Sequence, residues 1–307
     1  MEFTLHQLKL FVKIAEKQSV TKTAEELFLS QPAVSIQLKK MQDQFDIPLT
    51  EVVGRQLYIT DFGKEVAESA KKILVEIDRL NYRTKSFKGI LAGRLKLSTA
   101  STAKYVMPYF LSDFMNLYNG VDLIMDVTNK TKVVENLERN EVDFSLVSVV
   151  PEQLSLNRVE LMQNKLFFVG GTVLKRNPKT PIRHLLKKIP LLFRETGSAT
   201  RNAMEEFLDK NNIHSFKKIE LTSNEALKQA VVAGLGYSIM PLIGIKNELG
   251  NGDLEIIPFK GLPIITHWNL VWLKSKKLSP VAEAYLKFVI EEKERIIKEN
   301  FDWFEKY

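Results

Sequence analysis

The chain has 307 residues, 45% of them hydrophobic and 26% charged, which is typical of a soluble globular protein of about two or three domains. It contains no cysteine, which excludes disulfides, iron–sulfur clusters and thiol nucleophiles, and its four histidines are scattered, so we expect no metal site and no cofactor. The net charge of +7 suits a nucleic-acid partner, although much of the excess lies in residues 161–194, where eight Lys and Arg meet no acid.

No apolar run approaches the roughly 18 residues that a membrane-spanning helix needs. The N-terminal stretch "MEFTLHQLKLFVKIAEKQ" has no basic start that leads into an unbroken apolar segment, so it does not read as a signal peptide. We therefore expect a cytoplasmic protein with no membrane partner.

Apolar spacing in residues 1–45 predicts three short helices. The first places apolar side chains three or four residues apart, at Leu5, Leu8, Phe11, Val12 and Ala15. The second, residues 21–28, follows a cap at Ser19 or Thr21 and should turn inward Ala24, Leu27 and Phe28. Ser30 is a good N-cap for the third, whose first turn tolerates Pro32. The third helix should bury Val34, Leu38, Met41 and Phe45.

The opposite face of the third helix is polar. It carries Gln31, Pro32, Ser35, Gln37, Lys39 and Lys40, and Ser30 and Thr21 lie beside it. Glutamine and serine can hydrogen-bond base edges in the major groove, proline can contact a thymine methyl group, and lysine binds phosphates. The pattern favours a helix-turn-helix that contacts double-stranded DNA through these eight residues. A small helical bundle with a solvated face explains the three helices equally well.

Two further features favour DNA binding. Strand-like runs flank Gly54-Arg55, which predicts a hairpin wing whose tip places Arg55 on the DNA backbone or in the minor groove. The following segment has no proline or glycine between Gly63 and Gly89, and its heptad positions are Val66, Ala70, Ile73, Ile77, Leu80, Thr84 and Phe87. A coiled coil through this seam would pair two helix-turn-helix units. The alternative is that the stripe packs on its own domain.

Two stretches, "FVKIAEKQSVTKTAEELFLSQPAVSIQLKKMQ" and "IPLTEVVGRQLYITDFG", resemble the N-terminal domain of LysR-type transcriptional regulators. The resemblance covers about the first 90 residues in order. Three positions depart from the family pattern: Ile36 replaces a frequent arginine, Gln42 a usual glutamate and Thr50 a usual phenylalanine. The first departure affects base or backbone contacts, and the third affects an apolar contact beside the wing.

From residue 91 onward, strand-like and helical segments alternate, which predicts an α/β fold with mostly parallel sheets. Ligands in such folds bind where strand carboxyl ends meet helix N-termini. Three such junctions, "STASTAK", "RETGSATR" and "LTSNEA", are rich in small hydroxyl residues and suit an anion. Each Ser or Thr taken singly is more simply a helix cap. The acid-free stretch 161–194 has two interpretations. Its basic side chains either make the electrostatic potential over such a cleft more positive or lie on a solvated surface, and the second interpretation is favoured.

The stretch "VVAGLGYSIMP" and the loop "RETGSATR" resemble the effector domain of LysR-type regulators, in particular the Calvin-cycle and cysteine-regulator branches. The resemblance implies two α/β subdomains built like periplasmic binding proteins, joined by two crossover strands, with a small polar or anionic metabolite in the cleft. It implies a winged helix-turn-helix domain (1–61), a linker and dimerisation helix (62–90), and an effector domain (91–307) of subdomain I (91–163 and 268–307) and subdomain II (164–267). The effector-binding residues that it implies are Ser101, Thr102, Thr128, Ser148, Gly197, Ser198, Thr200 and Asn224.

These observations predict a homodimeric or homotetrameric transcription regulator that binds double-stranded DNA and a small metabolite, with RNA polymerase as a further candidate partner. The alternative is a cytoplasmic small-molecule-binding protein whose helix-turn-helix serves protein–protein interaction. A two-lobed enzyme has little support, because the sequence has no paired histidines and none of the nucleophile-elbow, P-loop or dinucleotide-binding motifs. A solute-binding protein is disfavoured by the missing export signal and by the helix-turn-helix.

Overall fold

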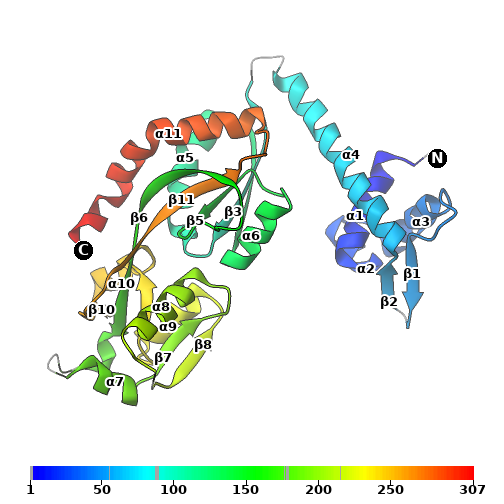
Figure 1. Cartoon of the computed structure of the whole chain (residues 1–307). Helices are drawn as coiled ribbons and strands as arrows, with labels where there is room; N and C mark the ends of the chain where they lie inside the picture. The colour runs from blue at the N-terminus through cyan, green and yellow to red at the C-terminus, as the bar shows by residue number, and fades with distance from the viewer. Residues whose placement is uncertain (1–2, 55, 87–89, 176, 178–179, 215) are drawn as a thin grey trace. The chain divides into compact units, whose positions relative to one another are not determined.

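The structure, a computed structural model, describes residues 3–54, 56–86, 90–175, 177, 180–214 and 216–307, without the side chains of 78–79, 81–86 and 187. The chain forms two compact units, Met1–Ile90 and Leu91–Tyr307, each with its own hydrophobic core (Figure 1). Two residues predicted to make contacts, Arg55 and Phe87, lie outside the described residues.

The first unit consists of three short helices, a hairpin and one long helix. Their bounds are α1 (Leu5–Lys17), α2 (Val20–Glu26), α3 (Gln31–Gln42), β1 (Thr50–Val53), β2 (Gln56–Ile59) and α4 (Asp61–Ser86). Each short helix begins at a side chain that accepts a hydrogen bond from the first turn: Thr4, which forms a capping box with Gln7, then Ser19 and Ser30. Pro32 lies in the first turn of α3, as predicted.

The apolar stripes of α1 and α3 meet in the core of this unit, where the side chains of Phe11 and Val34 are fully buried. The second helix is shorter than predicted and ends at Glu26. Phe28 therefore falls in the turn before α3, with a φ of 53° and 95% of its side chain exposed. The prediction that Phe28 points inward is wrong, because the chain has already left the helix at that position.

The first half of α4 belongs to the same core. Ala67 and Ala70 are 4% and 1% exposed, and Val66 packs against the cluster that they form with α1. The prediction that Ala70 lies in a seam with a partner helix does not fit the structure, because that side chain is enclosed within its own chain. Further along the helix, the side chains of Ile73 and Leu80 are 41% and 64% exposed.

The second unit is an α/β domain. Its elements in chain order are β3 (Ala92–Ala100), η1 (Ala103–Tyr105), α5 (Met107–Leu117), β4 (Gly120–Thr128), α6 (Lys130–Glu138), β5 (Phe144–Val147), β6 (Leu156–Gly171), η2 (Thr172–Leu174), α7 (Ile182–Lys188), β7 (Leu191–Arg194), α8 (Ala199–Lys210), β8 (Lys218–Leu221), α9 (Asn224–Val232), β9 (Ser238–Pro241), η3 (Leu242–Gly244), α10 (Lys246–Asn251), β10 (Leu254–Ile256), β11 (Ile264–Leu273), α11 (Pro280–Phe301) and η4 (Asp302–Lys306).

Among the described residues, the main sheet has the strand order β10-β6-β11-β5-β3-β4, and β9 also pairs with β6. β3 runs parallel to both β4 and β5, whereas β6 and β11 run antiparallel to their neighbours. The sheet is therefore mixed rather than mostly parallel, because the two strands that connect its halves reverse direction. β7 and β8 form a separate parallel pair.

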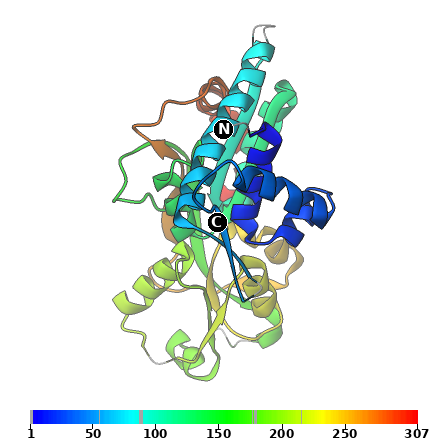
Figure 2. The same ribbon diagram turned by 90° about the vertical axis from the view of Figure 1, so that its right-hand side faces the viewer.

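The domain has two lobes, which Figure 1 shows joined by the long strands β6 and β11, and Figure 2 shows the same ribbon turned by 90°. The first lobe contains β3–β5 with helices α5, α6 and α11, and the second contains β7–β10 with helices α7–α10. One buried cluster spans both lobes, since it joins Phe114 and Tyr285 of the first lobe to Leu192 and Leu227 of the second, and another around Phe193 and Phe207 lies in the second lobe. The predicted subdomain boundaries, after residues 163 and 267, fall inside β6 and β11.

Candidate DNA interface and effector site

The N-terminal half of α3 presents a polar surface. Gln31 and Pro32 are exposed, and Ser35 is half-buried beside them. The Nε2 atom of Gln31 donates a hydrogen bond to Oγ of Ser35 over 2.9 Å, because residues four apart lie on one face of a helix. This contact orients an amide and a hydroxyl together, which is the donor and acceptor chemistry that base edges require.

The other predicted DNA contacts differ in their availability. Lys39, Lys40 and Thr21 are exposed, which suits phosphate contacts. Gln37 is half-buried, and its Oε1 atom accepts a hydrogen bond from Nε2 of Gln7 over 3.3 Å. Gln37 therefore fastens α3 to α1.

The predicted wing is present as a hairpin. β1 and β2 pair antiparallel from Thr50 opposite Ile59 to Val53 opposite Gln56. The turn begins at Gly54, whose φ of 58° lies in the left-handed region that glycine adopts most readily.

Three of the predicted effector-binding residues lie at one edge of the main sheet. β3 lies between β4 and β5 and runs parallel to both, so the carboxyl ends of the three strands point the same way. Ser101 directly follows β3, Thr128 ends β4, and Ser148 directly follows β5. The structure thus groups these three residues at the edge where α/β sheets bind ligands.

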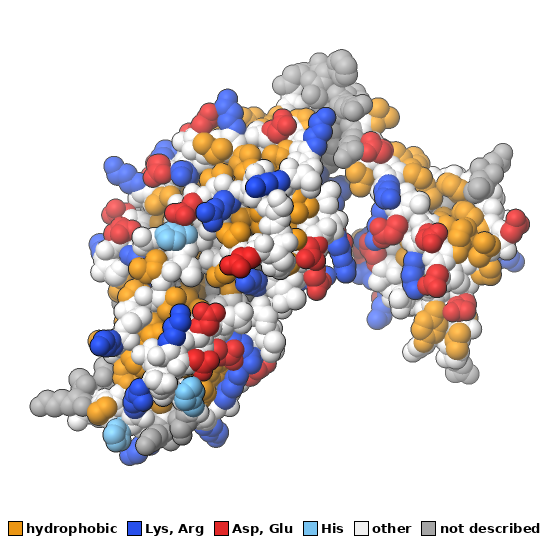
Figure 3. Space-filling model, viewed as in Figure 1, with side chains coloured by type: hydrophobic (Ala, Val, Ile, Leu, Met, Phe, Trp, Pro, Cys, Tyr) orange, Lys and Arg blue, Asp and Glu red, His pale blue; other side chains and the backbone are white. Residues whose placement is uncertain are grey.

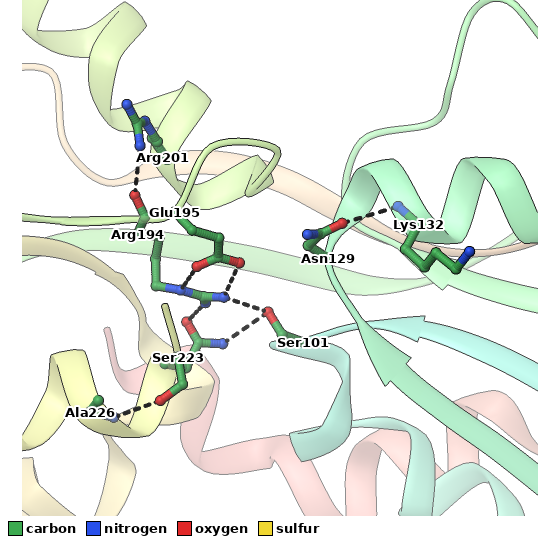
Figure 4. A network of polar contacts seen from close by, with 9 residues as sticks. Ser101, Asn129, Lys132, Arg194, Glu195, Arg201, Ser223 and Ala226 are labelled. Atoms are coloured by element: carbon green, nitrogen blue, oxygen red, sulfur yellow. Dashed lines mark hydrogen bonds and ion pairs between the residues drawn. The ribbon is translucent and has the colours of Figure 1, made fainter. Parts of the chain in front are cut away.

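The carboxyl end of β7 brings a buried guanidinium group to this edge. Arg194, the last residue of β7, is 3% exposed. Its Nε and Nη2 atoms each donate to the Glu195 carboxylate over 2.8 Å, and Nη2 also donates to Oγ of Ser101 over 3.2 Å. Nη1 donates to the side-chain oxygen of Asn224, whose Nδ2 atom donates to Ser101 over 3.4 Å. Figure 4 shows Arg194 between Glu195 and Ser101. Side chains of both lobes therefore share one hydrogen-bond network.

Gly197 brings the loop after β7 close to α6 in the first lobe. Its φ is +87°, and a Cβ atom placed on it would lie 2.7 Å from Oγ1 of Thr131 and 3.9 Å from Cγ of Asn129. Asn129 caps α6 by accepting a hydrogen bond from the backbone N–H of Lys132 over 3.0 Å, as Figure 4 shows. The N-terminus of α6 thus faces the loop that leads into α8, and the positive ends of helix dipoles attract anions.

The remaining predicted effector residues differ in role. Ser198 precedes α8 without a side-chain capping bond and is 4% exposed, and Thr102 is 6% exposed before η1. Thr200 is half-buried in the first turn of α8. The interpretation of Ser and Thr as simple caps holds for Ser223, whose hydroxyl accepts from the N–H of Ala226, and fails for Ser198.

Arg201 holds the backbone of the site. Its Nη1 atom donates to the carbonyl oxygen of Arg194 over 3.1 Å and to Glu220 over 2.7 Å, and its Nε atom donates to Glu205 over 2.9 Å. Burial lowers the pKa of this guanidinium group, but the hydrogen bonds to the two carboxylates outweigh burial and raise the pKa overall. Arg201 is therefore charged, and it connects α8 to the carboxyl end of β7.

Sequence reasoning missed Arg194, Glu195, Asn129 and Thr131. An arginine at the end of a short, wholly apolar strand was the available signal, because a buried charge at a strand's carboxyl end requires a partner. The packing of the Gly197 loop against α6 had no signal in the sequence, because it depends on how the two lobes meet.

The basic side chains of the acid-free stretch 161–194 lie in different environments, some buried and some exposed. Among its described side chains, Arg194 lies in the network, whereas Lys165 is buried and donates to the carbonyl oxygens of Phe304 and Tyr307 over 3.2 and 2.9 Å. Lys175, Arg183 and Lys188 are exposed. Figure 3 shows acidic and basic side chains interspersed over one face of the second unit. The solvated interpretation therefore fits most of the stretch.

Within the described part of the chain, no group of three or more acidic or histidine side chains could hold a metal ion. The helices that the structure describes include none that is long and apolar enough to cross a membrane.

Two family models match this chain. Residues 5–64 match the bacterial regulatory helix-turn-helix protein of the lysR family, and residues 88–294 match the LysR substrate binding domain. The chain is 36% identical over 295 residues to the HTH-type transcriptional activator CmpR of Synechocystis, which covers 95% of this chain and 97% of the relative. It is 34% identical to the RuBisCO operon transcriptional regulator of Allochromatium vinosum, over 96% of this chain and 98% of the relative.

Solved structures agree in fold. The regulatory domain of CcmR from Synechocystis PCC6803, in complex with 2-PG, is 30% identical with a TM-score of 0.60, over 65% of this chain and 97% of that one. Full-length CbnR complexed with its target DNA has a TM-score of 0.68 at 20% identity, over 95% of this chain and 99% of that one. With its winged helix-turn-helix and its two-lobed α/β domain, this chain belongs to the LysR family of transcriptional regulators.

Proposed function

We propose that the effector of this regulator is a small anion that carries a phosphate or carboxylate group, and that Arg194 holds it where the two lobes meet. The effector then controls how the winged helix-turn-helix binds operator DNA. Sequence-specific DNA binding under the control of a small metabolite is the function of the LysR family, so the proposal concerns the chemical class of the effector and the residues that bind it.

The observation that carries the proposal is the buried position of Arg194. A guanidinium group with 3% exposure needs an anionic partner, and Glu195 supplies one here through two hydrogen bonds of 2.8 Å. Phosphate and carboxylate groups accept the same forked pair of N–H donors. An effector anion can therefore replace Glu195 on Arg194, and the N-termini of α6 and α8 add favourable dipoles.

The comparisons support this class of effector. The CcmR regulatory domain, which is 30% identical over 65% of this chain, is described in complex with 2-PG. Relatives at 32% to 34% identity are named as regulators of the RuBisCO operon. We therefore extend the proposal to a metabolite of carbon fixation and to target genes of the same metabolism.

We further propose that the chain acts as a homodimer or homotetramer paired through α4. Ile73 and Leu80 are exposed apolar side chains on the predicted heptad seam, and burying such side chains between two helices favours association. A two-fold dimer would place two helix-turn-helix units on two half-sites, and RNA polymerase would be a partner at the promoter.

The test is a titration of the purified full-length chain by isothermal calorimetry. The ligands are 2-phosphoglycolate and 2-phosphoglycerate, which carry both a phosphate and a carboxylate group, with glycolate and inorganic phosphate as fragments. Arg194→Gln should abolish binding of the ligand that the wild type binds. Arg139→Gln is the matched control, because Arg139 is an exposed arginine at the end of α6 and its loss removes the same charge.

Binding that survives in Arg194→Gln, at wild-type affinity and in a folded protein, would refute the proposed site. Binding of a neutral metabolite in place of these anions would refute the proposed class. Circular dichroism of both variants separates loss of the ligand site from loss of the fold.

A further inference from the structure

Ile36 is an exposed apolar side chain on the face of α3 that also carries Pro32, Lys39 and Lys40. Its side chain is 54% exposed, whereas Val34 and Met41, on the buried face of α3, are 0% and 1% exposed. Core packing therefore explains Val34 and Met41 but not Ile36.

The position of Ile36 on α3 is central among the predicted DNA contacts. Pro32 precedes it by four residues, and Lys39 and Lys40 follow it by three and four, so these side chains are neighbours on the helix surface. Ser35, held by Gln31 over 2.9 Å, is the adjacent residue. Ile36 thus lies between the side chains suited to base edges and those suited to phosphates.

The chemistry of isoleucine limits what it can contact there. It has no hydrogen-bond donor or acceptor, so it can bind neither a phosphate nor the polar edge of a base. The major groove offers one apolar feature, the C5-methyl group of thymine, and bringing two apolar groups together out of water is favourable.

We propose that Ile36 contacts the methyl group of one thymine in each half-site and is therefore a specificity-determining residue. This contact reads a feature that the amide of Gln31 and the hydroxyl of Ser35 cannot read. It makes this regulator prefer thymine over cytosine at one position, which an arginine at the same place would not do.

The test uses the full-length chain and a duplex that it selects from a random-sequence pool. Each thymine of the half-site is replaced in turn by deoxyuridine, which removes the methyl group and leaves base pairing unchanged. The wild type should bind about fourfold more weakly at one position, the fold-change that corresponds to one buried methyl group. Ile36→Ala should bind the thymine and deoxyuridine duplexes equally at that position.

Ile47→Ala is the matched control, because Ile47 is 53% exposed in the same unit but lies outside α3. It should keep the wild-type sensitivity to deoxyuridine. Ile36→Ala with unchanged sensitivity at every position would overturn the proposal, as would a half-site without any methyl-sensitive thymine. Sensitivity lost in Pro32→Ala but retained in Ile36→Ala would assign the methyl contact to Pro32 instead. Any of these results would leave sequence-specific DNA binding itself intact.

Discussion

The Nη2 atom of Arg194, in the second lobe, donates a hydrogen bond to Oγ of Ser101, in the first lobe, over 3.2 Å. The same guanidinium group is held by Glu195 and Asn224. A ligand that changes the partners of Arg194 therefore acts on a contact between the lobes. Since a ligand shifts an equilibrium by its differential affinity for two states, this contact links occupancy to the arrangement of the lobes.

Replacing Glu195 by glutamine should strengthen binding of an anionic effector. In our proposal the Glu195 carboxylate competes with the effector for Arg194, so its neutral analogue should raise the affinity about tenfold, as expected for the loss of a charge-assisted hydrogen bond. Calorimetric titration with 2-phosphoglycolate measures the change. Weaker binding in the variant would mean that Glu195 supports the site rather than competing for it.

Gly197→Ala should destabilise the effector domain. A left-handed φ of +87° costs a non-glycine residue about 1–2 kcal/mol, and the new Cβ would lie 2.7 Å from Oγ1 of Thr131. Thermal unfolding should show the loss as a midpoint lower by roughly 3–6 °C. The double variant Gly197→Ala/Thr131→Ala should recover the part that comes from the clash and keep the part that comes from φ. Equal midpoints for the single and double variants would exclude the clash.

Gln31→Ala and Ser35→Ala should weaken specific DNA binding far more than nonspecific binding. A hydrogen-bonded base contact is worth about 1–3 kcal/mol, which is about fivefold to 150-fold in affinity, and nonspecific DNA does not offer it. Gel-shift titrations measure specific affinity on a selected duplex and nonspecific affinity on a scrambled duplex. Gln37→Ala is an informative control, because its contact with Gln7 predicts a loss of stability instead. Equal losses on both duplexes would contradict base reading by Gln31 and Ser35.

Lys39→Ala should reduce the dependence of DNA affinity on salt. One phosphate contact contributes a slope of about 0.9 in a plot of log affinity against log salt concentration, because binding releases a condensed counterion. Fluorescence anisotropy at several salt concentrations gives the slope. Lys13→Ala is the control, since Lys13 pairs with Glu16 and Glu26 on α1 and α2 and should leave the slope unchanged. An unchanged slope in Lys39→Ala would remove this residue from the DNA backbone.

Ile73→Asp should leave a monomer with low affinity for a two-fold operator. The predicted seam would bury a carboxylate there, which the partner helix cannot compensate. Val75→Asp is the matched control: both side chains are 41% exposed on α4, and two residues of helix turn Val75 to nearly the opposite face. Sedimentation equilibrium measures both masses. A dimeric Ile73→Asp, or a monomeric Val75→Asp, would exclude the predicted seam.

The sequence predicted the elements best where local chemistry decides. Helix α3 follows Ser30 and carries Pro32 in its first turn, as predicted, because the Ser30 hydroxyl accepts a hydrogen bond from the N–H of Ala33 and proline needs no hydrogen-bond partner there. The prediction that Phe28 points inward was wrong, because the helical spacing of apolar residues extends to Phe28 in the sequence, whereas the chain has already left the helix there. Ser101 follows β3 and Asn224 begins α9, and the effector-binding role that the family resemblance implied for both stays a prediction.

The sequence could not reveal contacts between segments distant along the chain. Arg194 reaches Ser101 across 93 residues, and the approach of Gly197 to Thr131 depends on packing between lobes. The prediction for Ala70 failed for the same reason, because its burial depends on the packing of α4 against α1. A heptad position looks identical whether its side chain meets a partner helix or its own domain.

β6 and β11 each serve both lobes, and they pair with each other from Leu156 opposite Leu273 to Leu166 opposite Ile264, with one shift of register between Trp268 and Asn269. Sliding one strand along the other by one residue would break this ladder and move the side chains of that strand to the other face of the sheet. Twisting the two strands together keeps the ladder intact. We therefore expect an effector to change the angle between the two lobes about the axis of this strand pair, and not to shift one strand along the other.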